Sequence, residues 1–207
     1  MSAIVPNSSS IQLSSGDYLD LLNPDPSVIT TDVLAHHLAQ ANRFAGAPVR
    51  PYSVCEHTIL VSKYLEAHRA PPWTILKGLH HDDSEAFLHD ITRPLKDQLP
   101  PYRIIEDIMT TVIEDALAFA RPSDEERLAI KEADLWALAC EAYYLMPSQG
   151  RGWHCEGMYD PGNKLHVKLS MFIRDDVKAI DYLSRLWILR HTKWLAFTED
   201  QTRRLRT

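Results

Sequence analysis

Cysteine is scarce in this 207-residue chain, and its three cysteines lie far apart. Cys55, Cys140 and Cys155 form no Cys-x-x-Cys pair, so their spacing argues against a disulfide framework and against a cysteine-based zinc site. An odd, widely spaced set of thiols is typical of a reducing compartment. The first residues, MSAIVPNSSS, also lack a basic segment followed by a long apolar run. The sequence therefore predicts a cytoplasmic protein.

Positive charge and long apolar runs are lacking as well. The 22 Lys and Arg residues are outnumbered by 28 Asp and Glu residues, which gives a formal net charge of -6. Such a balance provides no general basic surface for nucleic acid or for an anionic membrane. No stretch reaches the length of a transmembrane helix. We therefore expect no nucleic-acid and no membrane partner, and a phosphate-bearing ligand would have to meet positive charge locally.

Helix signals run through most of the chain. Capping boxes at Ser53-Val-Cys-Glu56 and Ser123-Asp-Glu-Glu126 each predict a helix start. Apolar residues at helical spacing and Pro or Gly stops complete the pattern. The predicted fold is an all-α bundle of about six main helices with a short N-terminal hairpin or extended segment. The expected helices span residues 31–42, 53–68, 72–94, 102–119 and 124–145, followed by a last helix with the inward stripe Leu169, Phe172, Ile173, Val177, Ile180, Leu183 and Trp187.

One domain accounts for nearly the whole length. Residues 1–10 are predicted to be a disordered N-terminus, 11–195 the domain, and 196–207 a polar C-terminal tail.

In the helix expected over 102–119, Ile105, Ile108, Met109 and Val112 should point inward. Residues 147–163 read as a long loop that could reach over a site.

The stretch GLHHDDSEAFLHDITRPLK, residues 78–96, carries unusual chemistry for a helix. If one helix runs from Pro72 towards Pro94, then Gly78, His81, Asp82 and Glu85 share a face. An inward face with an imidazole and two carboxylates must satisfy those groups, and a divalent cation would do so. Gly78 would leave space for a ligand or for a second helix. The alternative is a polar outer face, because a bare His-Asp pair is common.

Two more ionisable groups are predicted to turn inward on other helices. His57 shares a face with Val54, Leu60 and Val61, and Asp134 shares one with Ile130, Ala137 and Leu138. A lone inward His is more often an ordinary core residue, and an inward carboxylate is costly unless it is paired or bound to a metal. Taken together, the groups supply two nitrogen and at least two oxygen ligands, which suits a metal site with open positions. The four candidate ligands are His57, His81, Asp82 and Asp134.

This order of residues resembles the H…HD…D pattern of the HD-domain metal-dependent phosphohydrolases over about residues 11–145. The H-D-x-x-E extension through Glu85 and the D-x-x-x-P-L-K segment from Asp90 to Lys96 are similar to phage-type dATP triphosphohydrolases and bacterial 5′-deoxynucleotidases. The stretches SSGDYLDLLNPDP, LAHHLAQANRFAG and YSVCEHTILVS resemble the phage-type enzymes more closely.

The resemblance implies roles for particular residues. The four candidate ligands would hold Zn²⁺, Co²⁺ or Mn²⁺, and Asp90 could take Mg²⁺ as a second ion or bind a sugar hydroxyl. Glu85 would position or protonate the reacting groups, so Glu85 and Asp90 are the candidate catalytic residues. The candidate substrate-binding residues are Arg43, Phe44, Lys96 and His36, although a buried or supporting role explains His36 equally well.

The favoured hypothesis is hydrolysis of dATP to deoxyadenosine and tripolyphosphate. The alternatives are a 5′-deoxynucleotidase that releases phosphate from deoxynucleoside monophosphates and a non-catalytic nucleotide-binding module. Relatives of this kind are commonly homo-oligomers, and Trp187 and Trp194 are candidate exposed apolar residues for self-association.

Overall fold

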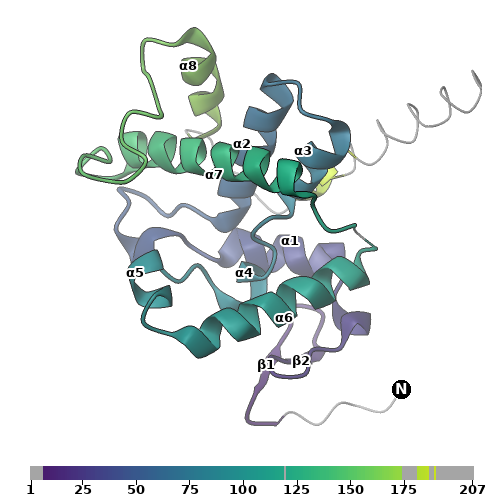
Figure 1. Cartoon of the computed structure of the whole chain (residues 1–207). Coiled ribbons are helices and arrows are strands. Elements are labelled where there is room, and N and C mark those ends of the chain that lie inside the picture. Colours follow the sequence, from purple (N-terminus) through teal and green to yellow (C-terminus); the bar gives the residue numbers. More distant parts are fainter. Residues whose placement is uncertain (1–6, 119, 174–180, 187–188, 190–207) are drawn as a thin grey trace, which may run out of the picture.

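The computed structural model describes residues 7–118, 120–173, 181–186 and 189. This part of the chain is mostly helical, and its one sheet is a two-stranded antiparallel hairpin near the N-terminus (Figure 1). The helical character predicted from the sequence is thus confirmed. Within the described ranges, no helix combines the length and the apolar character needed to cross a membrane. The 196–207 segment, Val177, Ile180, Trp187 and Trp194 lie outside the described residues.

The elements follow one another with mostly short connections. The strands are β1 (Ser10–Gln12) and β2 (Tyr18–Asp20), and short 3-10 helices are η1 (Pro26–Val28), η2 (Phe44–Gly46) and η3 (Met171–Ile173). The α-helices are α1 (Thr31–Gln40), α2 (Val54–Ala67), α3 (Pro72–Leu79), α4 (Glu85–Leu88), α5 (Arg93–Lys96), α6 (Pro100–Ala116), α7 (Asp124–Leu145) and α8 (Lys164–Ser170).

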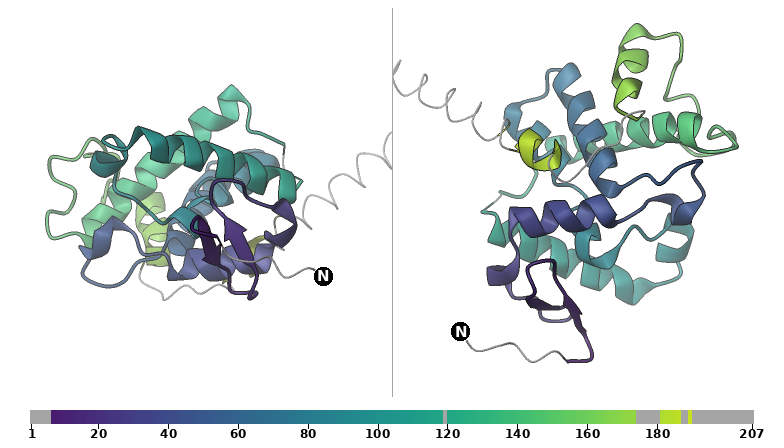
Figure 2. Two further views of the ribbon diagram at one scale, coloured as in Figure 1. Left: turned by 90° about the horizontal axis from the view of Figure 1, so that it is seen from below. Right: turned by 180° about the vertical axis from the view of Figure 1, so that it is seen from behind.

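Helix α2 lies at the centre of the packing and contacts α1, α3 and α7. Residues 54–62 of this helix are all buried, so polar groups on it must find partners inside the protein. The hairpin and α8 lie at opposite ends of the molecule, on either side of this central packing (Figure 2). The position of α2 explains how His57 reaches the interior.

Both predicted capping boxes are confirmed. The Ser53 hydroxyl accepts the amide of Glu56 at 3.2 Å, and the Glu56 carboxylate accepts the amide of Ser53 at 2.7 Å. Ser123 and Glu126 make the same reciprocal pair at 3.2 and 2.8 Å. These boxes satisfy amide groups that the first turn of a helix leaves unpaired, so α2 and α7 begin where the sequence indicates.

The single helix predicted across residues 72–94 is wrong. Helix α3 ends at Leu79, turns occupy residues 80–84, and α4 covers only Glu85–Leu88. Asp and Ser side chains compete with the backbone for hydrogen bonds and favour turns. The imidazole Nδ1 of His81 donates to the carbonyl of Gly78 at 2.8 Å, an oxygen that a continuous helix would offer to the amide of residue 82. The break therefore sets His81 and Asp82 in a turn and not on a helix face.

Other local predictions are corrected in part. The hairpin is present, but it begins at Ser10, inside the segment predicted to be disordered. On α6, Met109 is buried whereas Ile108 is 40% exposed, because the inward face turns towards Ile113. The stripe predicted for the last helix begins in α8, which ends at Ser170, and continues in η3; residues 181–186, which include Leu183, are helical again.

Candidate metal centre

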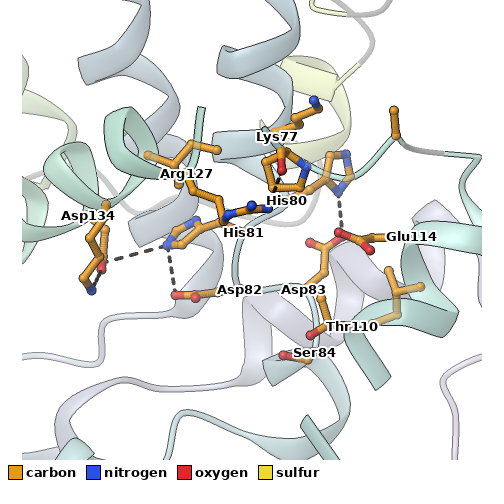
Figure 3. Close-up of a pocket in the computed structure, with 15 residues that line it drawn as sticks. Lys77, His80, His81, Asp82, Asp83, Ser84, Thr110, Glu114, Arg127 and Asp134 are labelled. Carbon is orange, nitrogen blue, oxygen red and sulfur yellow. Dashed lines mark hydrogen bonds and ion pairs between the residues drawn. The ribbon is translucent and has the colours of Figure 1, made fainter. Parts of the chain in front are cut away.

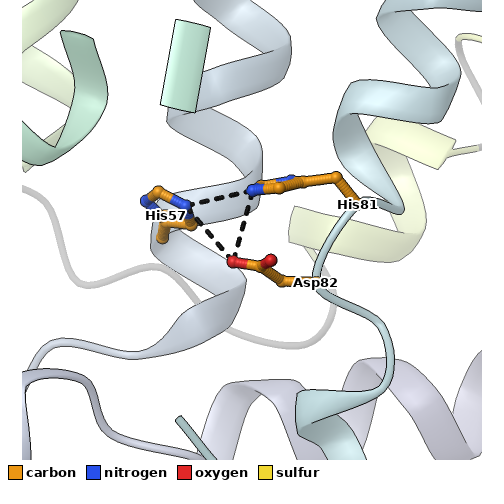
Figure 4. A group of neighbouring side chains, drawn as sticks. All are labelled: His57, His81 and Asp82. Atoms are coloured by element: carbon orange, nitrogen blue, oxygen red, sulfur yellow. Dashed lines mark hydrogen bonds and ion pairs between the residues drawn. The ribbon is translucent and has the colours of Figure 1, made fainter. Parts of the chain in front are cut away.

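Helix α2 and the turn after α3 bring together three side chains of the types that bind metals. His57 comes from α2, and His81 and Asp82 come from the turn after α3 (Figure 4). The Nε2 atoms of the two histidines are 3.3 Å apart, and the Asp82 Oδ2 lies 3.4 Å from His57 Nε2 and 3.2 Å from His81 Nε2. This group could hold a metal ion.

Asp134 approaches the same group from α7. Its Oδ1 lies 3.3 Å from His57 Nε2 and 4.0 Å from His81 Nε2, and its Oδ2 accepts a hydrogen bond from Lys131 at 2.7 Å. A cation with ligand bonds of about 2.0–2.2 Å holds neighbouring donor atoms about 3.0–3.5 Å apart. The structure therefore brings the four predicted ligands close together, and the separations around His57 are those that a shared cation needs.

Hydrogen bonds fix how both imidazoles face the centre. The carbonyl of Gly78 accepts from Nδ1 of His81, and the carboxylate of Glu141 accepts from Nδ1 of His57 at 2.6 Å. With the proton on Nδ1 in each ring, both Nε2 atoms carry lone pairs that face each other. Two such lone pairs at 3.3 Å repel each other unless a cation or a proton lies between them. The donor set thus fits a bound metal ion.

The electrostatics of the cluster also favour positive charge at its centre. Burial and Arg43 lower the pKa of His57, but the surrounding carboxylates, Glu141 first, raise it well above the ordinary value. Burial raises the pKa of Asp82, but His81 and His57 outweigh this and lower it well below the ordinary value. The carboxylates therefore stay ionised around the two imidazoles.

The cluster is closed on one side and open on the other. The side chain of His57 is fully buried, whereas those of Asp82 and Asp134 are 24% and 21% exposed. A cavity of about 470 Å³ between α3, α6 and the first half of α7 reaches His81, Asp82 and Asp134 (Figure 3). Its wall is completed by Lys77, His80, Asp83, Ser84, Thr110, Ile113, Glu114, Ala120, Pro122, Arg127, Ile130 and Lys131.

Glu85 is buried next to the cluster. Burial, followed by the carboxylates of Asp82 and Asp90, raises its pKa well above the ordinary value. Its Oε1 lies 3.3 Å from Nζ of Lys96, which also donates to Glu106 at 2.6 Å. Among the described residues, its Oε2 has no hydrogen-bond partner although it is buried. Glu85 is therefore a carboxyl group that can retain a proton and has one oxygen available.

Arg43 and Phe44 lie on a second side of the cluster. The buried Arg43 places Nη1 3.6 Å from Asp82 Oδ2, and its guanidinium lies 5.1 Å from the centre of the Phe44 ring. Phe44 has φ of +61°, a strained value for a non-glycine residue, and its amide donates to Asp90 Oδ2 at 3.2 Å. The ring of Trp153, from the predicted long loop, lies 5.9 Å from that of Phe44. The loop thus reaches the Arg43 side of the cluster.

The substrate-binding residues predicted from the sequence do not line the 470 Å³ cavity. Arg43, Phe44 and Lys96 gather instead around Glu85 and Asp90. His36 is exposed on α1, and its ring lies 5.8 Å from that of His37, so the suggestion that it is buried is wrong.

Glu141 was not predicted from the sequence. It is fully buried on α7, where it accepts hydrogen bonds from His57 and from the hydroxyl of Tyr52. A signal was present, because Glu141 lies seven residues after Asp134 and therefore on the same helix face. A second carboxylate on this inward face could have marked it as part of the site.

Comparisons with known proteins identify relatives. No protein-family model matches the chain. The uncharacterized protein YfdR of Escherichia coli strain K12 is 33% identical over 136 residues, which cover 66% of this chain and 71% of YfdR. The uncharacterized protein RCAP_rcc00048 of Rhodobacter capsulatus is 34% identical over 142 residues, which cover 63% of this chain and 70% of that protein. The chain therefore belongs to the family of proteins that includes YfdR.

Proposed function

We propose that this protein is an HD-domain metal-dependent phosphohydrolase of 2′-deoxynucleotides, and that its favoured reaction converts dATP and water into deoxyadenosine and tripolyphosphate. The observation that carries the proposal is the convergence of four donor groups beside a buried carboxyl. His57, His81 and Asp82 form a group that could hold a metal ion, Asp134 Oδ1 lies 3.3 Å from His57 Nε2, and Glu85 is buried next to Asp82. The H…HD…D resemblance supplies the reaction class.

A divalent cation at these donors would polarise a phosphoryl oxygen and lower the pKa of a bound water. Zn²⁺, Co²⁺ and Mn²⁺ all suit two imidazoles and two carboxylates, and Mg²⁺ beside Asp90 is the candidate second ion. Other side chains would bind the phosphate, orient the sugar and base, and transfer a proton.

Glu85 is the group best suited to proton transfer. In the favoured reaction, water attacks the α-phosphorus, the bond from that phosphorus to the 5′ oxygen breaks, and the 5′ oxygen takes up a proton. A carboxyl group with a raised pKa can donate this proton near neutral pH. Lys96, at 3.3 Å from Glu85, can pair with a phosphate oxygen once substrate is bound.

The nucleoside would lie on the Arg43 side. The guanidinium of Arg43 can bind a phosphate or a sugar oxygen, and the rings of Phe44 and Trp153 offer a surface on which a base can stack. The carboxylate of Asp90 can accept a hydrogen bond from a sugar hydroxyl. These contacts would select a nucleotide over a simple phosphate ester.

Product analysis tests the proposal. Purified protein is incubated with dATP, dGTP or dAMP and with Mn²⁺, Co²⁺ or Zn²⁺, and the products are identified by chromatography and phosphorus NMR. Deoxyadenosine with intact tripolyphosphate is the expected result. Asp82→Ala serves as the control, since it removes a ligand and should remove all metal-dependent turnover.

Other outcomes decide between the alternatives. Inorganic phosphate from dAMP with dATP left intact would replace the triphosphohydrolase by a 5′-deoxynucleotidase. Metal-dependent binding of dATP without turnover of any of the three nucleotides would overturn the enzyme and leave a nucleotide-binding module.

A further inference from the structure

A buried carboxylate joins the metal cluster to the residues on its second side. The Oε1 of Glu141 lies 2.6 Å from His57 Nδ1 and 3.1 Å from the Tyr52 hydroxyl. Its Oε2 lies 3.4 Å from Nε of Arg43, and among the described residues neither of these two atoms has a well-formed hydrogen bond. Glu141 itself is fully buried.

We propose that Glu141 is a positioning residue of the metal centre: its charge fixes the Nδ1–H tautomer of His57 and makes Nε2 of that ring a stronger metal ligand. The inference rests on the metal centre of the proposed function. It concerns a residue that neither binds the metal directly nor touches the reacting atoms.

The two histidines of the cluster are held differently, and this gives Glu141 its particular role. His81 donates Nδ1–H to a neutral backbone carbonyl, whereas His57 donates to an ionised carboxylate. A carboxylate acceptor raises the basicity of an imidazole ligand more than a carbonyl does, and such supporting groups influence metal affinity. His57 should therefore be the stronger of the two nitrogen ligands.

The burial of Glu141 would be costly without such a role. An ionised carboxylate away from water is destabilising unless charged and hydrogen-bonding groups compensate it. Here the compensation comes from groups on other elements, namely the His57 ring on α2 and the Arg43 guanidinium before η2. A carboxylate that only stabilised the fold would influence unfolding and leave metal affinity in the folded protein unchanged.

The test measures metal affinity in the full-length protein without reference to activity. Metal is removed with EDTA, and Co²⁺ and Zn²⁺ binding is measured by competition with a chromogenic chelator for the parent, Glu141→Gln and Tyr52→Phe. We expect Glu141→Gln to weaken binding about 10- to 100-fold. The matched control Tyr52→Phe removes the hydroxyl that donates to the same oxygen of Glu141 and keeps the contact with His57. This variant should therefore bind the metals nearly as tightly as the parent does.

Spectroscopy supplies a second readout. The visible absorption of bound Co²⁺ reports the ligand field, and it should change in Glu141→Gln while the circular dichroism spectrum stays that of the parent. Parent-like affinity and an unchanged Co²⁺ spectrum in folded Glu141→Gln would overturn the positioning role alone. Failure of the parent to bind any of these metals would instead overturn the metal centre, and the inference with it.

Discussion

Proton transfer at Glu85 is a property of a single residue and its surroundings. Its carboxyl is buried beside Asp82 and Asp90, and its pKa is raised. Glu85→Gln keeps the shape of the side chain but has no proton to donate near neutral pH. We expect kcat for dATP to fall about 10²- to 10⁴-fold while metal affinity stays close to that of the parent. Steady-state kinetics and chelator competition on the same preparation check this.

A neighbouring carboxylate offers the matched control. Glu106 also accepts a hydrogen bond from Lys96, so Glu106→Gln perturbs the same lysine without removing the proposed proton donor. Its effect on kcat should be much smaller. Equal turnover by Glu85→Gln and the parent would show that Glu85 has no part in the chemistry.

The sequence identifies site residues that are unusual among their neighbours in the sequence. It misses a residue whose partners lie far away in the sequence. His57 and Asp134 are visible because each places an ionisable group among apolar neighbours on one expected helix face, and Asp82 is visible because it follows His81 directly in the sequence. The role of Glu141 depends on its contacts with Tyr52 and with the His57 ring, which are 89 and 84 positions away in the sequence. No spacing rule within one helix could have paired them.

Helices α2 and α3 pack closely against each other at Gly78. A Cβ atom on Gly78 would lie 2.3 Å from Cδ1 of Leu65, so Gly78 leaves space for a second helix. Gly78→Ala gains up to about 1 kcal/mol in helix propensity, but overpacking costs about 1–3 kcal/mol. The expected net result is a destabilisation of about 1 kcal/mol, measured by denaturant unfolding.

A double-mutant cycle isolates the cause. In a Leu65→Ala background the clash is absent, so Gly78→Ala should be neutral or stabilising. The same loss of stability in both backgrounds would mean that close packing against Leu65 is not the reason for the glycine.

The N-terminal hairpin should show a pH dependence through Asp20. Hydrogen bonds from Ser9, Asn7 and the Leu22 amide lower the pKa of Asp20 from 3.8 to about 2. A carboxyl with a lowered pKa contributes stability above its unfolded pKa and loses it as the pH falls through the folded pKa. Asp20→Asn should therefore be less stable than the parent above pH 3.8, and the difference should vanish towards pH 2.

Unfolding of the two proteins by urea at several pH values measures this difference. If the difference in stability between the two proteins stayed constant from neutral pH to pH 2, the contribution of Asp20 would not depend on its ionisation. The effect is expected to be small, because the residue lies at the surface.

Element boundaries were predictable where a terminus is encoded by adjacent residues. Ser53 and Ser123 begin α2 and α7 through reciprocal bonds within four residues, and these starts were predicted correctly. The end of α3 was missed because no proline or glycine follows it in residues 80–84. Hydrogen bonds between side chains across the turn fix this end. One example is the hydrogen bond of 2.6 Å between His80 Nδ1 and Asp83 Oδ2.

At the scale of the whole molecule, metal binding should couple to the stability of the fold. The candidate ligands come from α2, from the turn after α3 and from α7, so they can meet only when these elements are packed together. A ligand that binds the folded state alone stabilises it by about 2.7 kcal/mol at a concentration of 100 Kd. For a chain of this size the midpoint of thermal unfolding should rise by roughly 5–10 °C.

Thermal unfolding of EDTA-treated protein, with and without added Mn²⁺, Co²⁺ or Zn²⁺, measures this shift. Asp82→Ala should abolish it because a ligand is lost, whereas Glu114→Gln, which removes a cavity carboxylate outside the four-ligand group, should retain it. A shift of the same size in both variants would place the cation at another site. Because α2 contacts α1 as well as α3 and α7, a metal held at His57 should stabilise the packing as one cooperative unit, and unfolding should therefore remain a single transition with the metal bound.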